Sequence, residues 1–164
     1  FDMRLIAYEP YPNAEAVREL GVELAPIERV FAEADFVTLH LPASDETAGL
    51  VDARLLGLMK PDAYFINAAR GRLVDEDALY TALSERRIAG AGLDVRMVEP
   101  PTDARFGALD NVVMTPHTGA ATPKARLWSG HAAAEAVVRV LRGERPEGLV
   151  NPEVWDRVAG AARR

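Results

Sequence analysis

The sequence predicts an α/β fold in which helices cover both faces of a parallel sheet. Short apolar runs that resemble buried parallel strands alternate with segments of helical periodicity, at intervals of about 20 to 30 residues. Helix-capping residues, prolines and glycines mark the boundaries between these segments. Polar or charged residues follow several of the apolar runs, at the sheet edge where open α/β folds bind their ligands.

Composition narrows the class of protein. The 164 residues suffice for one domain of ordinary size, and 49% hydrophobic with 27% charged residues is typical of a soluble globular chain. The net charge of −6 comes without a basic patch, so we expect no nucleic-acid partner. The chain has no cysteine, no apolar run near the roughly 20 residues of a membrane span, and no signal-peptide pattern at Phe1–Arg4. We therefore expect a cytoplasmic protein without disulfides, a metal site or a membrane partner.

The first part of the chain predicts three strands and three helices. The strands lie at Leu5–Tyr8, Val22–Leu24 and Phe36–Leu41. Asn13 caps a helix that runs through Leu20 and stops at Gly21. Pro26 lies near the start of a second helix, over 27–34. A third helix has its cap at Asp52 and carries four residues at core-facing spacing: Leu55, Leu56, Leu58 and Met59.

The remainder continues the same alternation. Strands are predicted at Ala63–Ala68, Ala89–Val95 and Val112–Thr115. Asp75 opens a helix with a small apolar face made of Ala78, Leu79, Ala82 and Leu83. Thr122 and Pro123 open a long helix that ends near Arg142 and Gly143. We therefore assign residues 1–143 to one domain and residues 144–164 to a hinge and a C-terminal segment that must dock elsewhere.

Several chemically useful side chains follow the predicted strands. If the strands are parallel, one edge of the sheet collects Glu9, Leu41-Pro42, Arg70, Asp94 and His117. The small residues around Arg70 let a backbone approach a ligand, and its planar guanidinium matches a carboxylate. With His117 and a loop carboxylate, Glu99, such a site can bind an anionic carbonyl compound and protonate it.

Each of these residues also has a purely structural interpretation. Arg70 fits a surface arginine in a tight turn, and His117 a structural histidine after a proline. Glu99 fits a solvated loop carboxylate, and Asp94 a helix cap or turn former.

Five segments, in unbroken order, resemble the nicotinamide-binding domain of the D-isomer-specific 2-hydroxyacid dehydrogenases. They are His40–Pro42, Ile66–Gly71, Leu73–Leu79, Gly92–Val95 and Asn111–His117. The similarity runs from about Leu5 to Pro152. It implies a doubly wound, Rossmann-like NAD-binding domain, and an oxidoreductase that transfers hydride between NAD(H) and a D-2-hydroxy or 2-keto acid.

The resemblance also implies roles for single residues. Arg70 would hold the carboxylate and carbonyl of a 2-keto acid, and His117 would protonate the carbonyl oxygen as hydride arrives at the carbon. Glu99 would orient His117 and favour its imidazolium form. The adenosine side of NAD would contact Glu9, Pro10, Leu41, Pro42 and Thr47. The nicotinamide side would contact Ala68, Arg70, Asp94, His117 and Gly119.

The chain departs from the family pattern at two informative positions. Glu9 replaces the usual aspartate, which keeps the charge and lengthens the reach. Arg96 stands where an aromatic residue is usual, so the loop that bears Glu99 is expected to pack differently and to alter substrate choice.

Two parts of the family pattern are missing. Only eight residues precede Glu9 and none is glycine, so the glycine-rich pyrophosphate turn and the first strand of the sheet are lacking. The separate substrate domain is lacking as well. We therefore interpret the chain as truncated at its N-terminus and expect residues 1–164 alone not to bind NAD or to be active.

The absent strand would lie between Leu5–Tyr8 and Phe36–Leu41. This lane could be filled by upstream residues, by a strand of another chain, or by direct pairing of those two strands. We favour upstream residues of a longer protein.

Two functions remain from the sequence. The first is the NAD-dependent enzyme, with a small 2-keto or 2-hydroxy acid as partner and room for a homodimer in the full-length protein. The second is a non-catalytic NAD-sensing or corepressor-like interaction module, because fold alone does not fix function.

Overall fold

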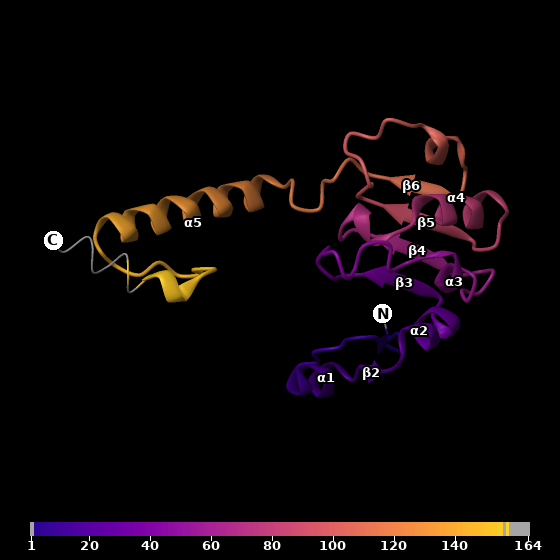
Figure 1. The fold of residues 1–164 in the computed structure, drawn as a ribbon, viewed down its shortest axis with the longest axis horizontal. Coiled ribbons are helices and arrows are strands. Elements are labelled where there is room, and N and C mark those ends of the chain that lie inside the picture. Colours follow the sequence, from indigo (N-terminus) through magenta and orange to yellow (C-terminus); the bar gives the residue numbers. More distant parts are fainter. Residues whose placement is uncertain (1, 156, 158–164) are drawn as a thin grey trace. The chain divides into compact units, whose positions relative to one another are not determined.

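The computed structural model describes residues 2–155 and 157, and the chain forms two compact units (Figure 1). The first unit, Phe1–His117, contains the strands. The second, Thr118–Arg164, contains the long helix α5 (Pro123–Leu141) and the short 3₁₀ helix η3 (Pro152–Val154). The two units are defined by compactness, whereas the predicted division into residues 1–143 and 144–164 is based on expected function. That division stays a prediction. Residues 156 and 158–164 of the predicted C-terminal segment lie outside the described residues.

All the described ladders of the first unit are parallel, as predicted. A two-stranded sheet joins β1 (Ile6–Ala7) and β2 (Glu23–Leu24). A four-stranded sheet follows the chain order, with β3 (Phe36–Leu39), β4 (Tyr64–Asn67), β5 (Gly90–Leu93) and β6 (Val112–Met114). In a doubly wound sheet, ligands bind outside the carboxyl ends of such parallel strands.

The structure tests whether β1 and β3 pair directly with each other. The two strands belong to separate sheets, and no ladder among the described residues joins them. Direct pairing of these strands, one of the three ways of filling the lane, is therefore wrong here. Filling by upstream residues stays a prediction.

The helices of the first unit largely match their predicted positions. They are α1 (Ala14–Leu20), α2 (Ile27–Glu33), α3 (Ala53–Leu56) and α4 (Glu76–Ser84), with the 3₁₀ helices η1 (Gly71–Leu73) and η2 (Arg105–Ala108). The side chains of Asn13 and Asp75 each accept two backbone N–H groups, so both predicted caps are confirmed. Helix α3 is shorter than predicted because the chain leaves it at Gly57. Leu58 is consequently 39% exposed instead of lying in the core.

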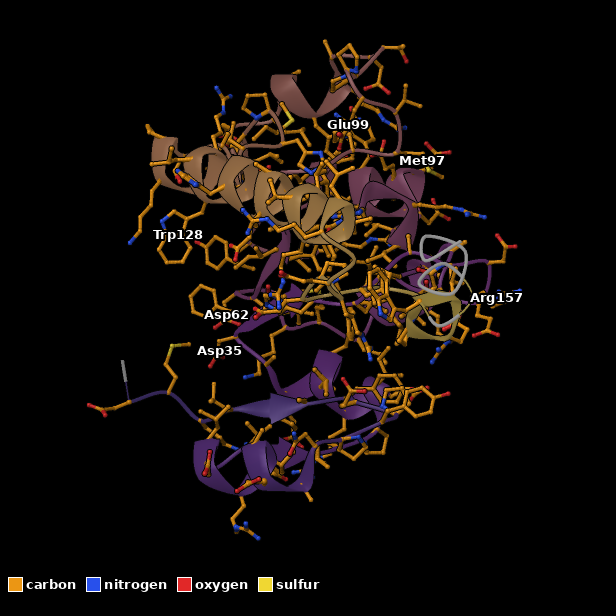
Figure 2. The ribbon with its side chains drawn as sticks, turned by 90° about the vertical axis from the view of Figure 1, so that its left-hand side faces the viewer. Asp35, Asp62, Met97, Glu99, Trp128 and Arg157 are labelled. Carbon is orange, nitrogen blue, oxygen red and sulfur yellow. The ribbon has the colours of Figure 1, made fainter. Side chains whose placement is uncertain are left out.

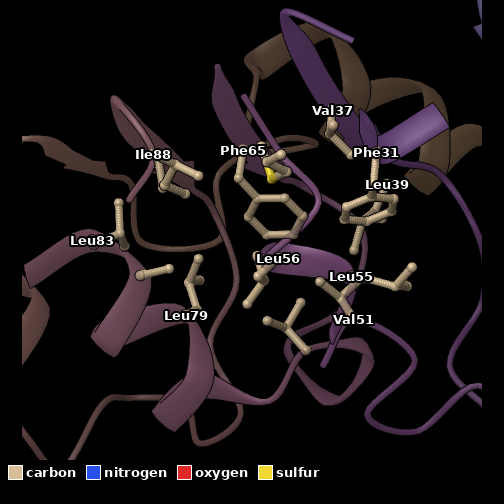
Figure 3. Packing of buried hydrophobic residues seen from close by; sticks show 14 of the residues in the cluster. Phe31, Val37, Leu39, Val51, Leu55, Leu56, Phe65, Leu79, Leu83 and Ile88 are labelled. Atoms are coloured by element: carbon tan, nitrogen blue, oxygen red, sulfur yellow. The ribbon is translucent and has the colours of Figure 1, made fainter. Parts of the chain in front are cut away.

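The core lies on one face of the four-stranded sheet. Phe65 of β4 is completely buried between the sheet and the helices, beside Leu56 of α3 and Leu79 and Leu83 of α4 (Figure 3). Side chains alternate between the faces of a strand, so Val37 and Leu39 of β3 share this core while their neighbours do not.

Several side chains on the opposite face of this sheet are exposed. Phe36 and Tyr64 stack with ring centroids 5.7 Å apart and are 51% and 46% exposed, and Val113 is 71% exposed. Right-handed crossovers between strands that progress in one direction put their helices on one face. The strand order β3-β4-β5-β6 progresses in one direction, so α3 and α4 lie on the same face of the sheet and both contribute residues to the core.

The second unit confirms the predicted long helix. Thr122 Oγ1 accepts a hydrogen bond of 3.1 Å from the backbone N–H of Ala125, and Pro123 occupies the first turn. Gly143, with φ of 73°, follows the helix end as predicted. Neither α5 nor any other helix of the described residues combines the length and apolarity needed to cross a membrane.

Candidate active site

Backbone hydrogen bonds bring the loops after β4, β5 and β6 together at one sheet edge. Asp94, after β5, donates its N–H to Asn67 O at 2.9 Å, at the end of β4. His117, after β6, donates its N–H to Asp94 O at 2.9 Å. Arg70 is three residues beyond the end of β4. The expected common edge for Arg70, Asp94 and His117 is therefore present.

Asn67 shapes the turn that ends in Arg70. It is a buried polar residue of the core, with 2% exposure. Its Nδ2 donates to Arg70 O at 3.0 Å, and its Oδ1 accepts from Ala69 N at 3.1 Å. Sequence reasoning gave Asn67 no role, although a polar side chain at the end of an apolar strand is a usable signal. Arg70 itself is exposed, and its Nη1 donates to Ala69 O at 2.6 Å.

Gly71 allows the turn after β4 to touch the loop after β5. A Cβ built on Gly71 would lie 2.0 Å from both the carbonyl carbon and the oxygen of Arg96, and 2.4 Å from Met97 N. No side chain fits there without moving the backbone. The Arg70 turn and the loop that bears Glu99 are therefore in direct backbone contact.

Glu99 and His117 form the central pair of the site. His117 Nδ1 and Glu99 Oε2 are 2.6 Å apart, and Arg96 N donates to Glu99 Oε1 at 2.9 Å. The hydrogen bond from His117 and then that from Arg96 N lower the pKa of Glu99, against the opposing effects of partial burial and of the Asp94 charge. Both side chains are solvent-accessible, at 51% for His117 and 36% for Glu99. Figure 2 labels Glu99 together with its loop neighbour Met97.

His117 has a constrained backbone. Its φ is 51°, in the left-handed region that non-glycine residues seldom adopt. Its N–H is shared between Asp94 O at 2.9 Å and Thr115 O at 3.0 Å. Thr115 Oγ1 in turn donates to Asp94 Oδ1 at 2.5 Å, so Asp94 is bonded through both its main chain and its side chain. Thr115 is a second supporting residue that sequence reasoning did not single out.

The loop between β5 and η2 is fastened to α4 by a shielded ion pair. Arg96 Nε and Nη2 donate to the two carboxylate oxygens of Glu76 at 2.9 and 3.0 Å. The side chains are only 8% and 15% exposed, respectively. The Arg96 guanidinium carbon also lies 4.4 Å from the centre of the Phe106 ring. Arg96 thus packs against an aromatic ring while it bonds to a carboxylate.

The residues predicted for the adenosine side lie on two other loops of the first unit. Glu9 and Pro10 are exposed after β1, and Glu9 Oε1 accepts from Tyr11 N at 2.9 Å. Leu41 and Pro42 follow β3, and Thr47 Oγ1 donates to Pro42 O at 3.0 Å.

The two remaining residues of the predicted nicotinamide side fall in different units. Ala68 is exposed in the Arg70 turn, whereas Gly119 belongs to the second unit. Within residues 2–155 and 157, no three His, Asp or Glu side chains cluster as metal ligands.

Comparisons with known proteins give this arrangement a family. Residues 1–119 match the family model described as D-isomer specific 2-hydroxyacid dehydrogenase, NAD binding domain. The chain is 46% identical over 154 residues to glyoxylate reductase of Pyrococcus furiosus, which covers 94% of this chain and 46% of that enzyme. It is 45% identical over 152 residues to D-3-phosphoglycerate dehydrogenase of Methanocaldococcus jannaschii, covering 92% of this chain and 29% of that enzyme.

A solved structure agrees with these relatives. D-lactate dehydrogenase with NAD⁺ from Lactobacillus jensenii matches with a TM-score of 0.81 and 32% identity, over 88% of this chain and 47% of that one. The chain thus spans less than half the length of these three proteins. Because the family model matches well over half of its residues, the chain belongs to the NAD-binding-domain family of the D-isomer specific 2-hydroxyacid dehydrogenases.

Proposed function

We propose that the protein containing this chain is an NAD-dependent oxidoreductase that transfers hydride between NAD(H) and a D-2-hydroxy acid or its 2-keto acid. The observation that carries the proposal is the 2.6 Å pair of His117 Nδ1 and Glu99 Oε2, at the same sheet edge as the Arg70 turn. The relatives named above are all enzymes, which favours catalysis over the sensing or corepressor-like alternative.

The side chains have complementary roles in this proposal. Arg70 binds the substrate carboxylate with guanidinium N–H groups other than the one that donates to Ala69 O. Glu99 accepts a hydrogen bond from His117 Nδ1, which leaves Nε2 as the atom that donates a proton to the carbonyl oxygen. Such a positioned acid contributes roughly 10²–10⁴ in rate. In the oxidation direction the same nitrogen removes the proton from the hydroxyl group.

The nicotinamide cofactor would occupy the same edge. NADH supplies the hydride, and this chain's residues fit its polar parts. The exposed Glu9 carboxylate after β1 suits two ribose hydroxyls, and Leu41, Pro42 and Thr47 form a turn after β3. Ala68, Asp94 and Gly119 are assigned to the nicotinamide half. We assign the pyrophosphate to a glycine-rich turn elsewhere in the full-length protein.

The partners and location belong to the same proposal. The partner is a small 2-keto or 2-hydroxy acid, and the acidic balance of the chain supports the absence of a nucleic-acid partner. We also propose a homodimer of the full-length protein. We propose a cytoplasmic location, since a reductase of this kind draws on the cell's NADH pool.

Turnover tests the proposal directly. We expect the full-length gene product to oxidise NADH with at least one of a panel of 2-keto acids that includes glyoxylate and pyruvate. His117→Asn should lower kcat by roughly 10²–10⁴ and leave NADH binding nearly unchanged. Arg70→Lys should mainly raise KM for the keto acid, because it loses bidentate binding. NADH binding without turnover of any keto acid would favour the non-catalytic alternative.

A further inference from the structure

We propose that Arg96 and Glu76 are positioning residues that hold Glu99 in register with His117. They do not touch the reacting atoms. They act through the loop after β5, which their ion pair fastens to the start of α4. The inference rests on the proposed function, because the register matters only if His117 is the acid.

Glu76 anchors the loop through three hydrogen bonds. Its two oxygens accept from Arg96 Nε and Nη2, and Oε1 also accepts from Met97 N at 2.7 Å. Glu76 is the first residue of α4, directly after the helix cap, and helix α4 packs its apolar face into the core. The carboxylate therefore ties two consecutive loop residues to the start of a helix that packs into the core.

The backbone N–H of Arg96 also contacts the Glu99–His117 pair. Arg96 N donates to Glu99 Oε1 at 2.9 Å, while Glu99 Oε2 meets His117 Nδ1 at 2.6 Å. A continuous series of contacts thus runs from Glu76 through Arg96 and Glu99 to His117. If the Arg96 side chain is released, its backbone N–H loses its fixed direction, and the Glu99 carboxylate loses one of its two anchors.

The chemistry of the Arg96–Glu76 ion pair favours a role in positioning the loop over a role in stabilising the fold. A shielded ion pair adds little net stability compared with apolar residues of similar volume. The Phe106 ring under the Arg96 guanidinium is itself apolar, so an apolar side chain could pack against it as well. A charged, bidentate pair adds fixed direction, which an apolar contact does not.

Three groups facing Glu99 set its charge state. His117 and the Arg96 N–H favour the carboxylate, and Asp94 disfavours it. On the neighbouring turn, the backbone of Gly71 contacts the backbone of Arg96. Arg105 lies 5.4 Å from the same Phe106 ring and is paired with Asp77. Its Nη2 is also 3.9 Å from Glu76 Oε2, beyond hydrogen-bond distance, and it has no described contact with Glu99.

The test compares Arg96→Met, Arg96→Lys and Glu76→Gln with Arg105→Met in the full-length gene product. Arg105→Met is the matched control because it removes a cation from the same ring. We measure kcat, KM and the pH profile of keto-acid reduction, and the pKa of the ¹³C-labelled Glu99 carboxyl by NMR. Arg96→Met should lower kcat by about 10- to 100-fold with little change in KM for NADH, as misplacement of a catalytic group does.

The carboxyl titration gives a reading that does not depend on turnover. In Arg96→Met the pKa of Glu99 should rise toward its ordinary value, because one of the bonds that lower it is weakened. Arg96→Lys and Glu76→Gln should change kcat and this pKa in the same direction by less, and they carry the test if Arg96→Met does not fold. Arg105→Met removes only a long ion-pair contact with Glu76 and none of the hydrogen bonds that Glu76 accepts from the loop, so it should change both quantities much less than Arg96→Met does.

Two results would overturn the inference. One is an Arg96→Met protein that melts earlier but keeps the wild-type kcat, pH profile and Glu99 titration. The other is an equal change in Arg105→Met. Lack of turnover in the wild type would count against the proposed function instead. The Glu99 titration would still test the inference, because it does not depend on turnover.

Discussion

The loops around His117 and the N-terminal pair β1–β2 belong to the same unit but are held in different ways. The first region combines a buried Asn67, a backbone contact at Gly71 and a shielded ion pair at Arg96. In the second, none of residues 2–25 is buried. Its most evident ties are ion pairs from the exposed Arg4 to Glu23 and Glu33, both at 2.8 Å.

The difference separates the two halves of the proposed site. Exposed ion pairs contribute little and are screened by salt, whereas the packing of buried apolar side chains is not weakened by such screening. The proposed catalytic half therefore lies on the sheet β3–β6, whereas the proposed adenosine half near Glu9 depends on a region in which no described residue is buried. The following substitutions, made in the full-length gene product, test this contrast.

The largest expected effect is in the core beneath the catalytic loops. Phe65→Ala removes a completely buried ring and should lower the free energy of unfolding by about 3–5 kcal/mol. Leu24→Ala, in β2, removes a side chain that is 42% exposed and should cost less than about 1 kcal/mol. Urea unfolding of both variants measures the difference. Equal losses would show that β1–β2 is as well packed as the sheet.

The next effect concerns the contact between the two catalytic loops. Gly71→Ala places a Cβ on the backbone of Arg96 and should cost about 1–3 kcal/mol, together with a fall in kcat. Gly92→Ala is the matched control, because the nearest atom to its Cβ would be 3.9 Å away. Thermal melts and steady-state rates separate the two. A Gly71→Ala protein with wild-type kcat would mean that the loop contact has no part in catalysis.

A smaller effect is expected at the adenosine half. Glu9 should repel the 2′-phosphate of NADP and accept the 2′-hydroxyl of NAD, so NAD should bind more tightly. Glu9→Ala should reduce this preference by about tenfold, which corresponds to roughly 1.4 kcal/mol. Fluorescence titration with NADH and NADPH measures both affinities. Similar affinities in the wild type would contradict the assignment of Glu9.

The smallest effect is the pH dependence contributed by Glu99. Its pKa in the folded protein lies below the ordinary value of 4.5, so its stabilising contribution is present above that value and is lost as pH falls through the lowered pKa. Glu99→Gln should therefore melt below the wild type at pH 7, and the gap should close on acidification. The gap should be modest because the side chain is partly exposed to solvent. A gap that stays constant down to pH 3 would exclude this linkage.

The sequence predicted the elements well where capping and periodicity act locally. Asn13, Asp75 and Thr122 cap helices as expected. Local rules failed at Leu58, because the chain leaves its helix at Gly57 and the helical period no longer sets the side-chain direction. They also do not place α3 and α4 on the same face of the sheet, which follows from strand order rather than from any single segment.

The candidate site was predictable in its main residues and not in its supports. Strand ends and the family resemblance together indicated Arg70, Glu99 and His117. The Arg96–Glu76 pair joins residues twenty positions apart on different elements, and no spacing rule predicts such a contact. The substitution at Arg96 was visible in the sequence, but its consequence required the position of Glu76.

The chain-order arrangement of β3, β4, β5 and β6 has a consequence for folding kinetics. Strand partners such as Phe36 with Tyr64, or Ala91 with Val112, are separated by only about 20 to 30 residues, so each ladder closes a short loop. This sheet can therefore grow one strand at a time as the ribosome releases it. Its nucleus should include β4 and β5, whose core residues would show high φ-values, while β1 and β2 would join after the rate-limiting step.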